Sequence, residues 1–156
     1  MAMQLQQDFK ELLRLFNEND VKYLIIGGIA VLMHGYARNT VDLDLSVAAD
    51  QENAEKIVRV LGVLGFGTTD LSTALFTTEN SLVRIGVPPV RIEILNYLQG
   101  LSFEQAFANR IERNFQGVMV NLISLQDLIS NKKAVGRHKD LADVEGLEKM
   151  AARDDH

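Results

Sequence analysis

The sequence predicts an α/β protein in which a small mixed β-sheet is flanked by helices. Three observations predict this class. Short apolar runs typical of strands alternate with segments of helical periodicity. Two later strand-like runs follow each other with no room for a crossover helix, so some strands pair antiparallel. Hydrophobic residues make up 47% of the chain, enough for a sizeable core, and no repeat or linker divides it, so we expect a single domain over residues 1–156.

Five elements are predicted in the first part of the chain: a helix over 4–18, a strand over 21–26, a short helix over 29–36, a strand over 41–47 and a helix over 49–64. The first helix carries apolar residues at helical spacing. The first strand, VKYLII, is short, β-branched and aromatic, and a Gly-Gly pair ends it. Gly35 lies near the end of the short helix. The second strand, VDLDLSV, alternates strictly, and GFG stops the helix that follows it.

The second part is predicted to contain strands over 73–78, 81–87 and 90–95, a helix over 103–110, a hairpin of 111–115 and 118–123, and helices over 125–135 and 138–153. Pro88-Pro89 separates two of these strands, because proline cannot donate to a ladder. Gln116-Gly117 forms the turn of the hairpin. Ser124 is the expected N-cap of the next helix, and Asp127 fits a capping box loosely.

Composition excludes several classes of site. The chain has no cysteine, hence no disulfide, thiolate metal site or cysteine nucleophile, which fits a cytoplasmic location. Its polar, amphipathic start lacks the pattern of a signal peptide, and no apolar run approaches the ~20 residues that cross a bilayer, so no membrane partner is expected. A net charge of -5 argues against non-specific nucleic-acid binding over the whole surface.

Asp42 and Asp44 stand in a strand that otherwise has the composition of a core strand. Residues i and i+2 point to the same side of a strand, so both carboxylates share one face while Val41, Leu43 and Leu45 share the other. Two like charges side by side are unfavourable without a cation. Carboxylate oxygens at this spacing can hold one or two Mg²⁺ ions. The alternative is a solvated strand face with no function.

Gly27 and Gly28 lie where a predicted strand runs into a helix. Free backbone N–H groups at such a helix start attract phosphate, and glycine lets a ligand approach closely. The alternative is an ordinary turn. Further along, VRIEIL places Glu93 in another apolar strand, where it could complete a metal site or accept a proton from a hydroxyl. Its alternative is a surface glutamate on an alternating strand.

These motifs together resemble the signature of the DNA polymerase β-like nucleotidyltransferase superfamily. Gly27-Gly28, thirteen residues and then Asp42-Leu43-Asp44-Leu45 match that signature in order and spacing, and VRIEIL matches the position of its third acidic strand. The tail SLQDLISNKKAVGRHKDLADVEGL resembles the C-terminal helices of small bacterial nucleotidyltransferases, including those related to abortive-infection and toxin–antitoxin systems. The resemblance covers residues from about 23 to 147.

The resemblance implies transfer of a nucleoside monophosphate from an NTP to a hydroxyl, with release of pyrophosphate. It implies Asp42, Asp44 and Glu93 as the catalytic, metal-binding carboxylates for two Mg²⁺ ions, and Gly27 and Gly28 as the residues that admit the triphosphate. The acceptor stays open between RNA, protein and a small molecule, and a homodimer or an antitoxin partner is compatible. Glu93 departs from the family's usual Asp, so the alternative is an inactive binding or regulatory protein of the same fold.

Basic side chains are needed to stabilise the leaving pyrophosphate. Arg38, just before the acidic strand, is the first candidate, and its alternative is a surface arginine that offsets the aspartates. Lys132 and Arg137 are the second candidates, from a basic cluster in an otherwise acidic protein. The alternative for that cluster is a set of helix C-terminal cations paired with Asp140 and Asp143.

Overall fold

A computed structural model describes residues 7–37, 39, 42–66, 70–87 and 90–154. The elements in chain order are α1 (Gln7–Glu18), β1 (Tyr23–Ile26), α2 (Gly27–Met33), β2 (Leu43–Val47), α3 (Gln51–Val63), α4 (Ala74–Thr77), β3 (Leu82–Val87), β4 (Val90–Leu95), α5 (Phe103–Ala108), β5 (Ile111–Phe115), β6 (Val118–Leu122), α6 (Leu125–Val135) and α7 (His138–Asp154).

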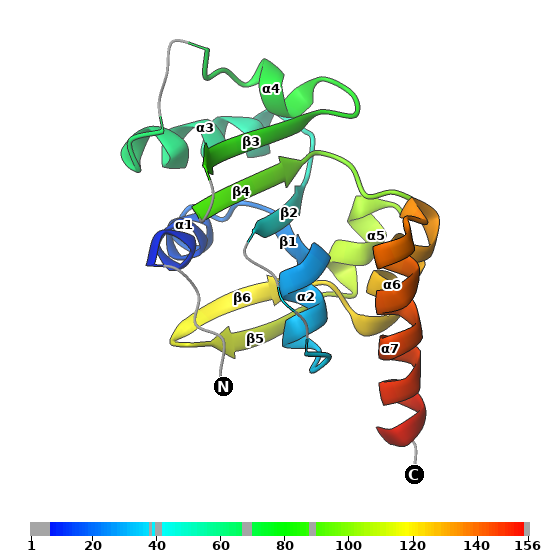
Figure 1. The fold of residues 1–156 in the computed structure, drawn as a ribbon. Helices are drawn as coiled ribbons and strands as arrows, with labels where there is room; N and C mark the ends of the chain where they lie inside the picture. The colour runs from blue at the N-terminus through cyan, green and yellow to red at the C-terminus, as the bar shows by residue number, and fades with distance from the viewer. Residues whose placement is uncertain (1–6, 38, 40–41, 67–69, 88–89, 155–156) are drawn as a thin grey trace.

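The strands form one six-stranded sheet in the order β3-β4-β2-β1-β6-β5 (Figure 1). Its mixed character confirms the predicted class, whereas the strand order was not predicted. The two central neighbours β1 and β2 are antiparallel. Each then pairs in parallel with a strand from later in the chain, β1 with β6 and β2 with β4. The outer strands β3 and β5 are antiparallel to their neighbours. The register that matters for the site places Asp44 beside Ile26 on one side and Glu93 on the other.

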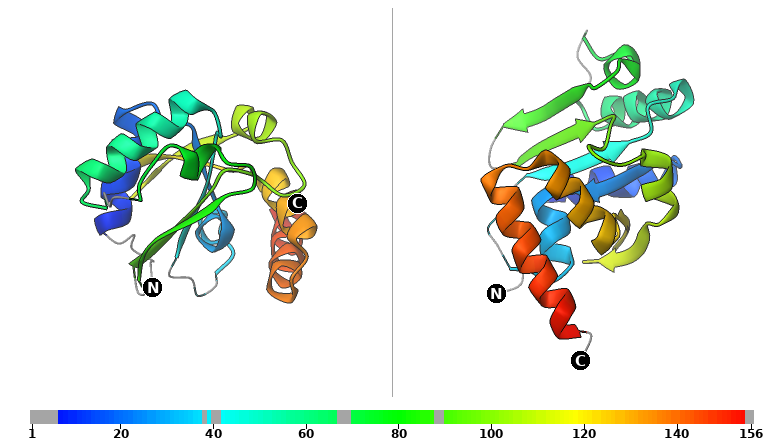
Figure 2. Two further views of the ribbon diagram at one scale, coloured as in Figure 1. Left: turned by 90° about the horizontal axis from the view of Figure 1, so that it is seen from above. Right: turned by 90° about the vertical axis from the view of Figure 1, so that its right-hand side faces the viewer.

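Helices flank both faces of this sheet (Figure 2). On one side α1 and α3 pack together, and the Phe16 ring of α1 lies 5.7 Å from the ring of Tyr23 in β1. Tyr23 is in register with Val47, so the buried alternate residues of β2 face α1 and α3. Asp44 therefore points to the opposite face. On that side lie α2, α6 and α7, and α7 packs along α6.

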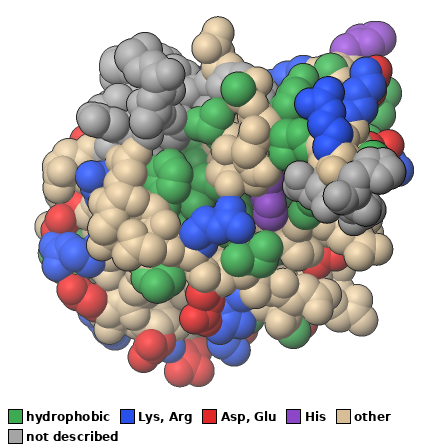
Figure 3. All heavy atoms as spheres, turned by 90° about the horizontal axis from the view of Figure 1, so that it is seen from below, with side chains coloured by type: hydrophobic (Ala, Val, Ile, Leu, Met, Phe, Trp, Pro, Cys, Tyr) green, Lys and Arg blue, Asp and Glu red, His purple; other side chains and the backbone are tan. Residues whose placement is uncertain are grey.

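Two helix starts are fixed by local capping. Ser124 accepts a hydrogen bond from the backbone N–H of Asp127 at the start of α6, which confirms the predicted cap. Asp50 accepts one from Asn53 at the start of α3. The face seen from below mixes basic, acidic and apolar side chains instead of gathering one charge over the surface (Figure 3). Within the described ranges, no helix is both long and apolar enough to cross a membrane.

One predicted element is wrong and several boundaries move by one to three residues. Residues 73–78 form the short helix α4 instead of a strand, because Phe76 is buried in the core and the backbone closes helical bonds, such as Thr78 N–H to Ala74 at 3.1 Å. Tertiary anchoring thus overrides the strand preference of threonine. Helix α2 begins at Gly27 itself, α3 begins at Gln51, and β2 begins at Leu43, one residue after Asp42. The predicted Pro88-Pro89 break lies outside the described residues.

Candidate active site

The sheet brings the three predicted carboxylates to one face. Because β2 and β4 run parallel with Asp44 opposite Glu93, their side chains point the same way. Asp42 precedes Asp44 by two residues and joins them. The pairing of β2 with β4 therefore assembles residues that are about fifty positions apart in the sequence.

Burial and neighbouring carboxylates strongly raise the pKa of Asp44. Burial, together with the neighbouring carboxylates of Glu93 and Asp42, raises the pKa of the Asp44 carboxyl to about 7, and the cations of Lys132 and Lys139 oppose this rise. The Oδ1 atoms of Asp42 and Asp44 are buried and have no hydrogen-bond partner among the described residues. Unpaired buried oxygens are costly, and at a cluster of carboxylates they point to a ligand that supplies positive charge.

Two arginines that sequence reasoning missed pair with the other carboxylates. Arg91 donates to Asp42 at 2.8 Å, and Arg84 donates to Glu93 at 2.9 Å. The Arg91 Nε also lies 3.9 Å from Glu93. A signal for Arg91 was available, since it stands two residues before Glu93 and so shares its face of the strand. Arg84 is opposite Glu93 only through the register of β3 with β4, which the sequence does not reveal.

Gly27 provides the space that Asp44 occupies. Its backbone has φ +69°, and a Cβ added there would lie 2.9 Å from the Cβ of Asp44 and closer still to its Oδ2. Glycine is thus required both for the conformation and for the close approach. Gly27 opens α2, whose N-cap residue Ile26 makes no side-chain cap, and Gly28 is buried in the first turn.

Gly27→Ala is expected to lower the free energy of unfolding by about 2–3 kcal/mol, because a left-handed alanine is strained and its Cβ collides with Asp44. Urea unfolding followed by circular dichroism measures the change. Gly62→Ala in α3 is the matched control, since an added Cβ there meets nothing within 4 Å, and it should be neutral or slightly stabilising. Equal effects of the two substitutions would contradict this reading of Gly27.

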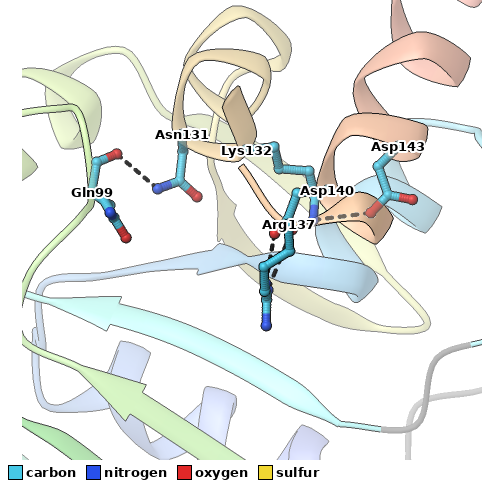
Figure 4. Close-up of polar contacts among 6 residues, drawn as sticks. All are labelled: Gln99, Asn131, Lys132, Arg137, Asp140 and Asp143. Carbon is cyan, nitrogen blue, oxygen red and sulfur yellow. Dashed lines mark hydrogen bonds and ion pairs between the residues drawn. The ribbon is translucent and has the colours of Figure 1, made fainter. Parts of the chain in front are cut away.

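A cavity of about 240 Å³ opens in front of the carboxylates. Its charged lining residues are Asp44, Glu93, Arg84, Lys132, Arg137 and Asp140. Its mainly apolar lining residues are Ile26, Leu82, Leu95, Tyr97, Leu98 and Val135. Asn131 also lines it, and its side-chain amide donates to the Gln99 carbonyl at 3.0 Å (Figure 4). A cavity with apolar and charged walls suits a ligand that has both kinds of surface.

Lys132 of α6 and Arg137, which lies between α6 and α7, both pair with Asp140 (Figure 4), but one is buried and the other exposed. Lys132 is only 5% exposed, and its Nζ lies 3.1 Å from Asp140 and 3.0 Å from Asp143. Arg137 is 59% exposed at its side chain and donates to Asp140 at 2.7 Å. Burial raises the pKa of Asp140, but the hydrogen bonds from Arg137 and Lys132 outweigh it and hold that pKa below its ordinary value. The pairing that the sequence left as an alternative is therefore present, although both cations line the cavity.

The acidic residues fit Mg²⁺ by the chemistry of their donors. All three are carboxylates, the ligands that hard divalent cations prefer, and two of their buried oxygens are unpaired. The three side chains are not arranged as a complete metal site. In the described part of the chain, no group of three or more His, Cys, Asp or Glu is placed to hold a metal ion. Two of the three carboxylates are instead paired with arginines. Arg38 lies outside the described residues.

Comparisons with known proteins agree on one class. Residues 3–152 match the model of a family described as "Nucleotidyltransferase of unknown function (DUF6036)". No curated protein matches the chain. A Thermotoga maritima protein assigned to the nucleotidyltransferases is similar in structure, with a TM-score of 0.56 at 14% identity over 97% of this chain and 95% of that one.

Two further solved structures share the fold. The antibiotic-resistance factor ANT(2'')-Ia gives a TM-score of 0.58 at 12% identity, covering 92% of this chain and 82% of that one. The lincosamide antibiotic adenylyltransferase LnuA, solved with lincomycin bound, gives 0.54 at 13% identity, covering 94% and 98%. At these identities the likeness concerns the fold, and it agrees with the mixed sheet flanked by helices.

Proposed function

The chain belongs to the nucleotidyltransferase family DUF6036, and from that premise we propose that it transfers a nucleoside monophosphate from an NTP to a hydroxyl acceptor and releases pyrophosphate. One observation carries the proposal: a single cavity holds the carboxylates of Asp44 and Glu93 and, from another part of the chain, the guanidinium of Arg137. The carboxylates suit a metal, and the guanidinium suits phosphates. A nucleotide with a bound metal ion presents a cation to the carboxylates and phosphates to the guanidinium.

Asp42, Asp44 and Glu93 are the residues we assign to Mg²⁺ binding, with two ions as the resemblance implies. Bound there, Mg²⁺ would neutralise the triphosphate and stabilise the attacking and leaving oxygens. Asp44 and Glu93 stand side by side on the paired strands β2 and β4, and Asp42 directly precedes β2. Gly27 and Gly28 are the residues we assign to the approach of the triphosphate, as the resemblance implies, and Gly27 lines the cavity together with Asp44.

Glu93 is the residue we assign to the acceptor hydroxyl, which it would orient and whose proton it would accept. Arg84 holds the Glu93 carboxylate at 2.9 Å, which fixes its direction toward the cavity. Glu is one methylene longer than the family's usual Asp, and this hydrogen bond restrains the longer side chain. If Glu93 does not support turnover, the protein would bind a nucleotide without transferring it.

Arg137 is the residue we assign to the leaving pyrophosphate, together with Arg38 from the sequence. Figure 4 shows the Arg137 side chain directed from the α6–α7 corner toward the strands. Asp140 holds it by two hydrogen bonds of 2.7 and 3.3 Å, and Lys132 in turn holds Asp140. Because its ammonium is committed to this pairing, we assign Lys132 a supporting role at the nucleotide site.

The test is to incubate the protein with each α-³²P-labelled NTP, Mg²⁺ and separate pools of RNA, protein and small hydroxylated molecules. The small-molecule pool is tried first, with lincosamides included, because a similar fold is that of a lincosamide antibiotic adenylyltransferase. We expect label on one pool, lost in Asp44→Asn and kept in Glu112→Gln, whose exposed carboxylate lies outside the cavity. NTP binding without label in any pool would favour the inactive alternative.

A partner antitoxin is a prediction that rests on the resemblance of the C-terminal helices alone. Expression in a bacterial host would then slow growth, and a neighbouring gene product would restore it. Unchanged growth on expression of the active enzyme would contradict this role without affecting the transfer reaction.

A further inference from the structure

Arg91 lies at the acidic face, but the family's signature gives it no role. We propose that Arg91 is a positioning residue, which holds Asp42 so that one carboxylate oxygen stays available to a divalent cation. This inference rests on the proposed function, since it concerns the cation that the carboxylates would bind. It adds a residue from β4 to the three acidic residues that the sequence singles out.

The contacts show how Arg91 holds Asp42. Both Nη2, at 2.8 Å, and Nε, at 3.3 Å, donate to the same oxygen, Asp42 Oδ2. The other oxygen, Oδ1, is buried and has no hydrogen-bond partner among the described residues. Asp44 Oδ1 is likewise buried and has no hydrogen-bond partner among these residues. Arg91 thus fixes the carboxylate through one oxygen and leaves the second unengaged, as expected of a residue that orients a metal ligand from behind.

Asp42 needs such support more than its neighbours do. Asp44 and Glu93 lie within strands, where ladder bonds on both sides fix the backbone, but Asp42 precedes the first residue of β2. It also lies near two other carboxylates, whose charges favour its rotation away from them. In the described part of the chain, Arg91 is the one hydrogen-bond partner of its side chain. Without the two-pronged contact, the Asp42 side chain would lose its direction.

Arg14 in α1 provides a comparison outside the site. It also pairs with carboxylates, those of Glu11 and Glu18, and its side chain is 51% exposed, against 33% for Arg91. Arg14 does not line the cavity. Lysine at position 14 therefore makes the same chemical change without touching a proposed metal ligand.

The experiment compares Arg91→Lys with Arg14→Lys, because lysine keeps the positive charge and removes the fork of donors. Mn²⁺ binding is measured by electron paramagnetic resonance and Mg²⁺ binding by calorimetry, on proteins whose circular dichroism and melting temperature match those of the wild type. We expect Arg91→Lys to raise the dissociation constant about tenfold, within the range for residues that support metal ligands, and Arg14→Lys to change it by less than about twofold.

The outcomes separate this inference from the function on which it rests. If the wild type binds Mn²⁺ and Arg91→Lys binds it equally well, the inference is wrong and the metal-binding function stands. An equal loss in Arg91→Lys and Arg14→Lys also overturns it, since the effect would then follow the loss of any guanidinium and not the support of Asp42. A wild type that binds no Mn²⁺ overturns the metal site itself, and this inference with it.

Discussion

Asp44→Asn is expected to stabilise the metal-free protein at pH 8 while it lowers nucleotidyl transfer by at least about 100-fold. Burial and the nearby Glu93 and Asp42 raise the pKa of Asp44 from 3.8 to about 7, so the ionised form is unfavourable in the fold. That pKa change corresponds to about 4 kcal/mol, and we expect about half of it, because the carboxylate is partly exposed. The same charge that destabilises the fold is the one required to bind a cation.

The pH dependence follows from which state binds the proton. Between about pH 4 and pH 7 the folded protein keeps a proton on Asp44 that the unfolded chain has lost. Stability of the wild type therefore falls as pH rises through this window, and the full cost is present above pH 7. The advantage of Asp44→Asn should accordingly be small at pH 4 and largest at pH 8.

Urea unfolding of the two proteins at pH 4.5 and pH 8, without divalent cations, measures this difference. Glu112→Gln is the control, because it removes an exposed carboxylate outside the cavity and should stay within about 0.5 kcal/mol of the wild type. If the difference in free energy of unfolding between Asp44→Asn and the wild type does not grow with pH, the ionised Asp44 carboxylate is not the cause of the destabilisation. Addition of Mg²⁺ should stabilise the wild type and leave Asp44→Asn nearly unchanged.

Lys132→Met is expected to lower the free energy of unfolding by about 3–5 kcal/mol, because it leaves two buried carboxylates without their shared cation. Lys132 Nζ joins Asp140 at 3.1 Å and Asp143 at 3.0 Å, and all three residues are at most 7% exposed at their side chains. These contacts connect α6 to α7. Their loss should also reduce the nucleotide affinity, since Asp140 would no longer be held beside Arg137.

Lys133→Met is the matched control for this prediction. Lys133 is the next residue of the same helix and also pairs with α7, through Glu148 at 3.0 Å, but its side chain is 57% exposed. An exposed ion pair contributes little, so this variant should lose at most about 1 kcal/mol. Urea unfolding of both variants measures the contrast. If Lys132→Met does not fold, adding Asp140→Asn and Asp143→Asn should restore folding, and failure to do so would argue against the charge explanation.

Much of the site could be predicted because its carboxylates follow local rules. Strand alternation put Asp42 and Asp44 on one face, and the glycine pair marked the turn beside them. The arginine partners were missed for different reasons. Arg91 carried a local signal, its two-residue spacing from Glu93, whereas Arg84 meets Glu93 only through the pairing of β3 with β4. The error at residues 73–78 has a similar origin, since burial of Phe76 selects helix there.

The sequence by itself determined the mixed α/β class, the positions of twelve of the thirteen elements and the acidic face, because periodicity, glycine and capping residues act over a few positions. Only the tertiary structure decided that Glu93 lies beside Asp44, that Arg91 holds Asp42, and that Lys132 is a buried link between two helices. Each of these depends on which distant segments pack together. Strand order and helix docking are set by the total burial of the core, and no short stretch of sequence contains that information.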